Sequence, residues 1–396
     1  MQNFRKTPQI SRESTSGIPW DRPFRQYGGT RSHQVVAAAD PLGFATRLKE
    51  VPRLNHKADV QGLVELLRRI HAESGDGLAD NDAWLPNDGR SFAATAAVVR
   101  DVGLLLGSIR RHGEEPLDLL PEIEPWLVWA GRRTDLPPRD TLLHYTVWNP
   151  DNALRTYTGL PEEVELIRAV KIAFPALEEG ISHLVDLFEI PLGSPDFAAT
   201  GDRAFQCISA VRGAAIHTFQ HVDRKVFIRS IRPYFEPIRV AGQDYLGPGA
   251  VAMPLFVFDH ILWSAPVIDP AYVKFKEDYL PVTLPYLRDL YRRFSDEGCL
   301  LERLVAVLGE EDASSPQIQA GLRALDRTFT LIQRFRSVHL RMAEQAYHHH
   351  QSEFVKGSGG YRPDMLGHIY RLAAKAQQLL RSHIHDRRLV PGAWGR

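Results

Sequence analysis

The chain has 396 residues, 44% of them hydrophobic, and its 48 basic residues balance its 48 acidic ones. This composition allows a large buried core, and the zero net charge does not favour a nucleic-acid binder, which usually carries a basic excess. Without a long apolar run, a signal-peptide core or more than two cysteines (Cys207 and Cys299), the sequence predicts a cytoplasmic protein with no membrane span, no disulfide framework and no cysteine-based zinc site.

The predicted elements are almost all helices. Residues 1–32 are rich in Ser, Thr, Arg, Pro and Gly without periodicity, so we expect a flexible tail there. Apolar residues at helical spacing then predict a mainly α fold. The predicted helices cover residues 60–73, 91–113, 161–190, 197–222, 224–235, 251–263, 271–295, 316–350 and 364–386.

Two long loops interrupt the helical pattern. The first, residues 147–163, is expected to join a smaller N-terminal helical domain (33–155) to a larger C-terminal one (156–396). The second, residues 237–254, is rich in Gly and Pro, and a loop of this length inside a compact domain is often functional. Pro175 is expected to kink or split the helix predicted over 161–190.

His339 stands alone within the predicted 316–350 helix. Leu325, Ile332 and His339 are spaced by seven residues, so the imidazole is expected to face the core rather than solvent. A core histidine whose ring nitrogens meet carbonyl groups is one explanation. A metal ligand is the other, and a single histidine can hold haem iron because the porphyrin supplies four further ligands. Arg336, one turn earlier, is then a candidate cation for the haem propionates.

The more conspicuous histidines carry less information. Adjacent residues on a helix point about 100° apart, so His348, His349 and His350 do not converge on one ion, and a solvated helix end is the favoured interpretation. The same holds for His383 and His385. No histidine has an acidic residue three positions before it, so a di-iron carboxylate bundle is not indicated.

A cluster of arginines occurs in residues 224–239 together with three aromatic residues. A solvated amphipathic helix accounts for this composition. Arg232, however, directly precedes Pro233, where a helix often ends, and an arginine at the end of a buried helix can hold a carboxylate through two hydrogen bonds.

Several segments together resemble one family. FRSVHLRMAEQAY (335–347) and SGGYRPDMLG (358–367) are similar to the haem end of the indoleamine and tryptophan dioxygenase superfamily, and most of all to its monodechloroaminopyrrolnitrin synthase family. The resemblance extends over about residues 38 to 385. Other segments that carry it are RDVGLLLGSIRRHGEEP (100–116), PPRDTLLHYTVWNP (137–150) and IRPYFEPIRVAGQDYLGPGAVAMPLFVFDHILW (231–263).

This resemblance implies an indoleamine 2,3-dioxygenase-like helical haem fold and a set of haem-binding residues. His339 matches the proximal ligand of a non-covalently bound haem b iron, and Arg336 matches the arginine that binds a haem propionate. Tyr347 and Ser358 match active-site positions and are the implied catalytic residues. Arg232 matches the arginine that approaches the substrate carboxylate.

The glycine-rich segment after the triple histidine matches a loop that closes over a bound indole amino acid. Its implied substrate-binding residues are Ser358, Gly359, Gly360 and Tyr361.

The resemblance also implies the activity. It predicts an enzyme of antibiotic biosynthesis that uses haem, dioxygen and an external electron donor to rearrange tryptophan or 7-chlorotryptophan into an aminophenyl-pyrrole. An indole-ring 2,3-dioxygenase or an indole monooxygenase on the same scaffold is the first alternative. A non-catalytic haem-binding protein is the second. No nucleic-acid or membrane partner is expected.

Overall fold

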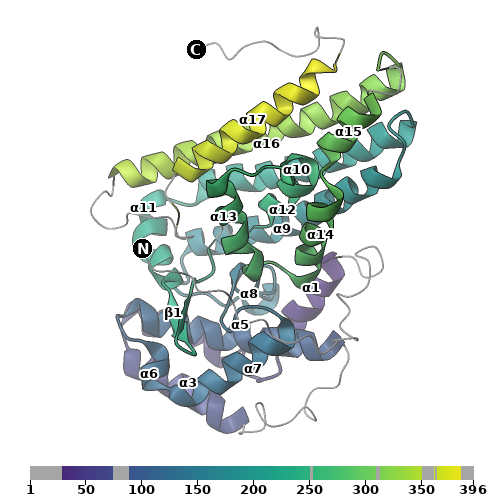
Figure 1. Ribbon diagram of the computed structural model, residues 1–396. Coiled ribbons are helices and arrows are strands. Elements are labelled where there is room, and N and C mark those ends of the chain that lie inside the picture. Colours follow the sequence, from purple (N-terminus) through teal and green to yellow (C-terminus); the bar gives the residue numbers. More distant parts are fainter. Residues whose placement is uncertain are drawn as a thin grey trace.

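The structure, a computed structural model, describes residues 29–74, 89–249, 253–308, 313–349, 361 and 364–384. Within these ranges the fold is mainly α, as predicted, and the only sheet is a two-stranded antiparallel hairpin. Figure 1 shows the N-terminal helices at one end of the molecule, the long helices α16 and α17 side by side at the other, and α9 and α10 between them.

The N-terminal part consists of short helices around one long one. Its helices are α1 (Gly29–Ala38), α2 (Val51–His56), α3 (Val60–Ser74), α5 (Gly89–Arg111), α6 (Pro116–Leu119), α7 (Glu124–Thr134) and α8 (Leu142–Tyr145). Residues 29–32, expected in the tail, therefore form the first turn of α1, and residues 1–28 lie outside the described residues.

The C-terminal part carries the long helices. Within the described residues, its α-helices are α9 (Pro161–Glu189), α10 (Pro195–His221), α11 (Arg224–Val226), α12 (Leu255–Asp259), α13 (Pro270–Tyr279), α14 (Pro285–Glu297), α15 (Leu300–Leu308), α16 (Pro316–His349) and α17 (Asp364–Ser382), of which α9, α10, α16 and α17 are the longest. Two π-helical turns, Phe227–Ile231 and His260–Ser264, continue α11 and α12. The hairpin strands are β1 (Ile238–Val240) and β2 (Gln243–Tyr245).

Four long helices form the frame of this part: α10 packs against both α9 and α16, and α17 packs against α16. Their ends follow from local sequence. Pro161 opens α9 with two glutamates in the first turn, where the helix dipole favours negative charge. Ser194 caps α10 by accepting a hydrogen bond from the Asp196 amide at 3.2 Å.

Most of the predicted helices are confirmed, with two corrections. Pro175 does not split its helix, because α9 runs unbroken from Pro161 to Glu189; the kink expected there stays a prediction. The segment predicted as one helix over 271–295 forms two helices, α13 and α14. Pro281 and Pro285 lie between or at the start of them, and proline has no backbone N–H to donate the hydrogen bond that a helix interior requires.

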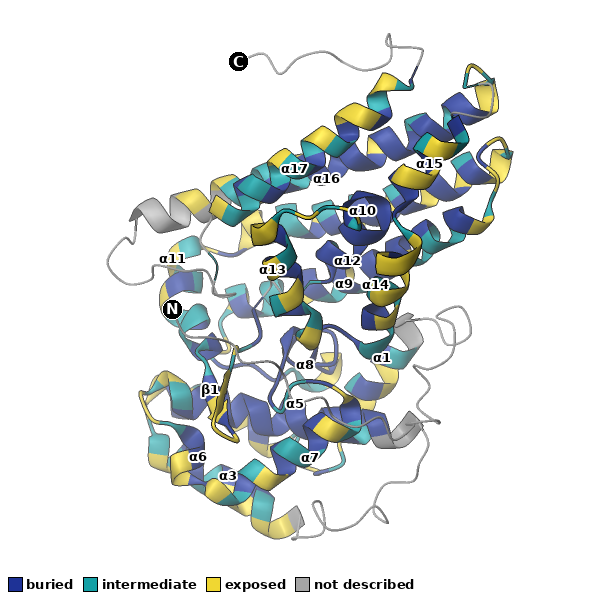
Figure 2. Cartoon of the chain, in the orientation of Figure 1, coloured by how far each residue is buried: buried dark blue, intermediate teal, exposed yellow. Residues whose placement is uncertain are grey.

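The buried apolar side chains form two clusters. One lies among the N-terminal helices and includes Leu63, Leu105 and Ile123 together with the hairpin residue Ile238. The other lies among α9, α10, α12 to α17 and α8. Figure 2 shows the buried residues along the facing sides of the long helices and the exposed ones on their outer sides. The division into domains at residues 155 and 156 stays a prediction, since residues of the C-terminal part contribute to both clusters.

Helix α5 is apolar because it is a core helix. Its segment Phe92–Arg111 has the length and composition of a membrane span, yet 94% of the most apolar stretch is buried inside the protein. Gly113, with φ +95°, ends the helical run where the sequence predicted it.

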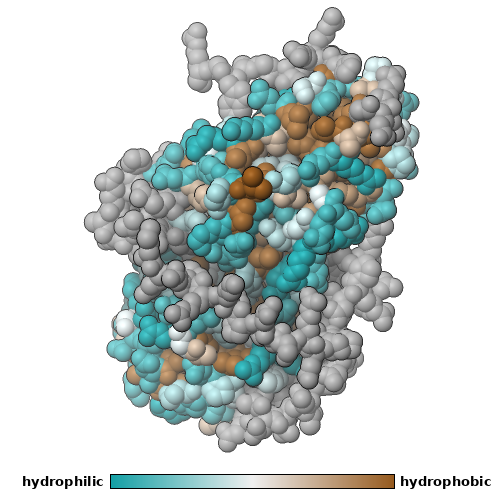
Figure 3. Space-filling model, in the orientation of Figure 1, coloured by the Kyte–Doolittle hydropathy of each residue, from teal (hydrophilic) through white to brown (hydrophobic). Residues whose placement is uncertain are grey.

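On the face shown in Figure 3, hydrophilic residues dominate, and hydrophobic side chains gather over the region of α15 and α17, where Leu379 is 47% exposed.

The loop that precedes α9 is held by one buried carboxylate. Glu163 accepts hydrogen bonds from the backbone amides of Tyr157 and Thr158, both at 2.7 Å, and of Gly159 at 3.2 Å. It also accepts from the Tyr145 hydroxyl at 3.0 Å. Burial raises the pKa of Glu163, and the hydrogen bonds from Thr158 and Tyr157 counteract that rise. The carboxylate thus replaces water as the partner of three loop amides and fixes the start of α9.

We expect replacement of Glu163 by Ala to lower the free energy of unfolding by about 3 kcal/mol, because several buried donors lose their acceptor. Urea denaturation measures this. Glu165→Ala is the matched control: it lies two residues further on α9 and pairs with His217 at the surface, and its cost should stay below about 1 kcal/mol. Equal losses in the two variants would contradict this role of Glu163.

Candidate functional site

A cavity of about 230 Å³ lies between the long helices of the C-terminal part. Helices α9, α10, α12, α13, α16 and α17 contribute to its walls. Most of the lining is apolar, and five lining residues carry polar groups. These are Thr218, Asp259, Tyr272, Arg336 and His339.

Small side chains keep this space open where α9 and α10 would otherwise close on α16. Ala169 and Ala173 lie one turn apart on α9, and Ala214 and Ala215 lie on α10. Larger apolar residues of the other helices, such as Phe256 and Phe275, complete the walls. A concave apolar site with a few polar groups is the usual form of a small-molecule or cofactor site.

His339 projects from α16 into this cavity. Leu325 and Ile332 of the predicted stripe are buried, as expected, but the side chain of His339 is accessible because the stripe reaches the cavity at this point. His339 is thus not enclosed by packed core side chains, and its assignment as a metal ligand stays a prediction. Burial within the protein lowers the pKa of His339, and the positive charge of Arg336 lowers it further. The imidazole is neutral at pH 7, which is the form that binds a metal.

Arg336 lies one turn before His339 and lines the same cavity, although only 5% of the residue is exposed. Its Nη2 donates to the carboxylate of Asp259, which ends α12. Its Nη1 is buried and has no hydrogen-bond acceptor among the residues that the structure describes. One nitrogen of the guanidinium is thus held by a carboxylate, and the other is a buried donor without an acceptor among the described residues.

Asp259 is held in place by two further donors. The Trp263 indole donates to its Oδ1 at 3.0 Å, and the Tyr272 hydroxyl donates to its Oδ2 at 3.2 Å. Burial raises the pKa of Tyr272 well above its ordinary value, so the hydroxyl remains a donor. Asp259 directly precedes the π-helical segment His260–Ser264, and this segment places the Trp263 indole next to the Asp259 carboxylate. π-Helical turns are frequent at functional sites.

A buried lysine lies behind this carboxylate. Lys276 donates to the backbone oxygen of Ser264 at 3.0 Å and approaches His260 Nδ1 to 3.4 Å. Burial lowers the pKa of Lys276 to about 8, and the charge of Asp259 opposes this decrease. Burial, assisted by Lys276, lowers the pKa of His260 to about 3, so this histidine is neutral and is not a second basic group of the site.

The other predicted site residues that the structure describes, Arg232 and Tyr361, are not among the lining residues of the cavity. Arg232 begins the 3-10 turn Arg232–Phe235 and is half-buried. Tyr361 packs against α13, where its hydroxyl donates to the Asp278 carboxylate at 2.5 Å and its ring lies 5.2 Å from the Phe275 ring. The Tyr361 ring thus contacts Phe275, which lines the cavity.

The remaining predicted site residues cannot be placed. Ser358, Gly359 and Gly360 lie outside the described residues, and so does the side chain of Tyr347, whose backbone belongs to α16. His348 and His349 are also within α16, without described side chains. Their predicted roles stay predictions.

Sequence reasoning missed Asp259 and Tyr272. The sequence does not show the partner of Asp259, because Arg336 lies 77 positions further along the chain. The FVFDH segment (256–260) lies within the helix predicted over 251–263. An acidic residue inside an otherwise apolar run is the signal that could have found it, since such a buried charge needs a partner.

Comparison with protein families matches residues 32–389 of this chain to the family described as monodechloroaminopyrrolnitrin synthase PrnB. The match covers nearly the whole chain, and the chain belongs to this family. The protein is therefore an enzyme, a tryptophan-rearranging oxygenase of pyrrolnitrin biosynthesis. The family resemblance inferred from the haem-end motifs is confirmed, and the matched range is slightly longer than the one inferred.

We expect Asp259→Asn to lower the free energy of unfolding by about 3 kcal/mol, because Arg336 then keeps a buried positive charge without its carboxylate partner. Urea denaturation of the purified protein measures the loss. Asp289→Asn removes one partner of an exposed pair with Arg292 and should change the stability by no more than about 0.5 kcal/mol. A neutral effect of Asp259→Asn would show that the pair is not essential to the packing of α16.

Proposed function

We propose that this oxygenase holds haem b in the cavity between α9, α10 and α16, with His339 as the ligand of the iron. With dioxygen, it would convert tryptophan or 7-chlorotryptophan into an aminophenyl-pyrrole. The observation that carries the proposal is the pairing of His339 with Arg336. His339, with a neutral imidazole, and Arg336, whose buried Nη1 has no hydrogen-bond acceptor among the described residues, both line this apolar cavity, one helical turn apart.

The residues present fit a haem in three respects. The walls are mostly apolar, as a porphyrin face requires. His339 offers a neutral nitrogen, and no described residue donates to or accepts from its ring. A haem propionate would supply the acceptor that Arg336 Nη1 lacks among the described residues.

When bound, ferrous haem supplies the site that activates dioxygen for attack on an indole ring. The protein's contribution is to bind, to orient and to exclude water. The apolar side chains of α9, α10 and α12 provide a dry surface on which an indole can lie. The pyrrole product requires the substrate's amino nitrogen to be held next to the indole carbon that it joins.

We further propose that Arg232 holds the substrate carboxylate and that Tyr347 and Ser358 orient the amino group or move its proton. Segment 358–361 would close over the substrate. The family resemblance of these positions supports their roles. One observed contact also supports this proposal. Tyr361, the last residue of the segment, contacts α13, and α13 carries the cavity residues Tyr272 and Phe275.

Replacement of His339 by Ala is expected to reduce the haem bound per chain at least about tenfold, because the iron loses its protein ligand. The amount of bound haem is measured from the haem absorption band and the iron content of the purified protein. Circular dichroism gives the folded fraction to which this amount is compared. His112→Ala is the control: this half-buried histidine bonds Asn55 in the N-terminal part and should leave the haem content unchanged. Full haem content in the His339 variant would refute the ligand assignment.

The products decide between the rearrangement and simple ring cleavage. We expect reduced, haem-loaded enzyme to release an aminophenyl-pyrrole from 7-chlorotryptophan, and the corresponding unchlorinated pyrrole from tryptophan, as measured by mass spectrometry. An N-formylkynurenine product would instead indicate an indole-ring dioxygenase. The yields from the two substrates, compared at equal concentration, identify the preferred one.

A further inference from the structure

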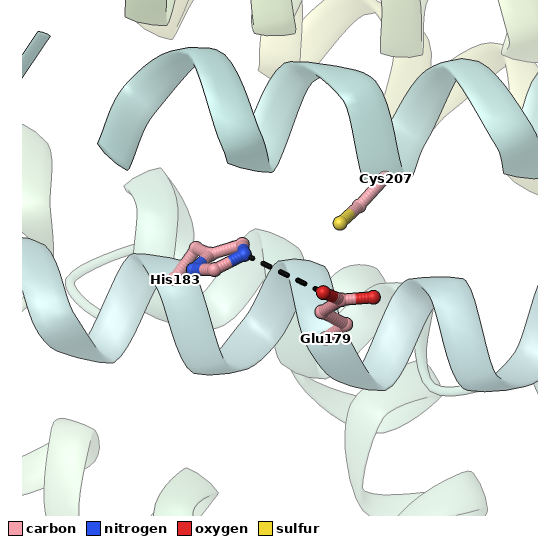
Figure 4. Close-up of side chains that lie close together, drawn as sticks. All are labelled: Glu179, His183 and Cys207. Carbon is pink, nitrogen blue, oxygen red and sulfur yellow. Dashed lines mark ion pairs between the residues drawn. The ribbon is translucent and has the colours of Figure 1, made fainter. Parts of the chain in front are cut away.

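A second group of metal-binding side chains lies on α9 and α10, apart from the cavity lining. Glu179 and His183 are one turn apart on α9, and Cys207 is on α10. One ligand atom from each residue lies within 4.8 Å of the other two. Figure 4 shows the three side chains directed into the same space between the two helices.

We propose that Glu179, His183 and Cys207 form a binding site for a thiophilic divalent cation, Zn²⁺, that ties α9 to α10. The sequence predicted no cysteine-based zinc site, because it contains only two cysteines that are far apart. The fold changes that prediction, since it brings one of them to a histidine and a carboxylate of another helix.

The donor set suits Zn²⁺ in both chemistry and spacing. Thiolate, imidazole and carboxylate are the three side-chain ligands of zinc in proteins, and three protein ligands leave the fourth tetrahedral position to water. Residues four apart on a helix lie on one face, so Glu179 and His183 can bind one ion without unwinding α9. The His183 Nε2 and Glu179 Oε1 atoms are already 3.8 Å apart, close to the ligand–ligand separation in a tetrahedral zinc site.

The surroundings support the same assignment. The other ring nitrogen of His183, Nδ1, is buried, and the nearest Asp186 carboxylate oxygen lies 3.9 Å from it, a little beyond hydrogen-bond distance. A carboxylate next to the non-binding nitrogen is the usual arrangement around a zinc-bound histidine, because it orients the ring and increases the basicity of the ligand nitrogen.

A glycine brings the thiol within reach. A side chain at Gly180 would have its Cβ 3.3 Å from the Cβ of Cys207, tighter than an ordinary contact. The glycine therefore lets α10 approach α9 beside the two α9 ligands. Burial, with the charge of Glu179, raises the pKa of the Cys207 thiol to about 11. The thiol is protonated at neutral pH, so coordination releases its proton to solvent as the Zn–S bond forms.

The site lies close to the cavity along the same helices. Leu177 and Val211 line the cavity, and they lie two residues before Glu179 and four residues after Cys207. A zinc ion at this position would fix the distance between α9 and α10 next to the cavity wall. This inference does not depend on haem, because none of its residues belongs to the cavity lining.

Zinc-edge X-ray absorption of tag-free, haem-containing protein loaded with one equivalent of Zn²⁺ tests the proposal. We expect one sulfur ligand at about 2.3 Å, together with nitrogen and oxygen ligands at about 2.0–2.2 Å. A sulfur ligand also separates this site from zinc held by the histidines at 348–350, which would show none. Cys207→Ser should remove the sulfur signal, and Cys299→Ser, which changes the other buried cysteine, should leave it unchanged.

Competition with a zinc-binding dye gives the affinities. His183→Gln is expected to weaken binding at least about tenfold and Asp186→Asn by about 10- to 100-fold, the range for residues that orient a zinc ligand. Zinc uptake without a sulfur ligand, or an unchanged sulfur signal in Cys207→Ser, would overturn the proposal. So would unchanged affinity in His183→Gln.

Discussion

The buried ion pair between Arg336 and Asp259 is the constraint on which the site depends. A guanidinium in an apolar interior is very unfavourable unless a carboxylate neutralises it. Asp259 ends α12, whereas Arg336 lies in the middle of α16, so the pair requires these two helices to meet. Trp263 and Tyr272 donate to the same carboxylate, which adds the π-helical turn and α13 to the contact. Four elements are thereby fixed around one charge.

The ion pair also determines what Arg336 and His339 can do. Asp259 accepts from Nη2 of the guanidinium, and Nη1 has no acceptor among the residues that the structure describes. His339 follows one helical turn later on α16, and both residues line the cavity. Helix α16 therefore carries both the Arg336 guanidinium, which can bind a carboxylate, and the neutral His339 imidazole, which can bind a metal. Side chains on a helix are held in position more precisely than side chains on a loop.

Helices α9 and α10 complete this arrangement from the opposite side. Their alanines keep the cavity open, while the Glu163 carboxylate fixes the beginning of α9 through three loop amides. One turn beyond the cavity lining, the same two helices carry Glu179, His183 and Cys207. The cavity of this tryptophan-rearranging oxygenase is thus lined by long helices that buried polar contacts hold in place.

The sequence by itself determined the helical elements and the orientation of His339. Apolar spacing located α3, α5, α9, α10 and α16 within a few residues, because a helix must bury one face whatever it packs against. Motifs around His339 and Arg336 indicated the family, since those residues are contiguous in the chain. Even here periodicity had a limit: it predicted an inward-facing imidazole, but not that the inner side was a cavity rather than a packed core.

Only the tertiary structure decided which residues meet. Asp259 and Arg336 are 77 positions apart, and Cys207 lies on a different helix from His183. The pattern along one helix shows which face is apolar, but it contains no information on which helix covers that face. Long-range partners depend on how all the helices pack at once, and for that reason the carboxylate behind Arg336 and the thiol beside His183 became apparent only in the folded chain.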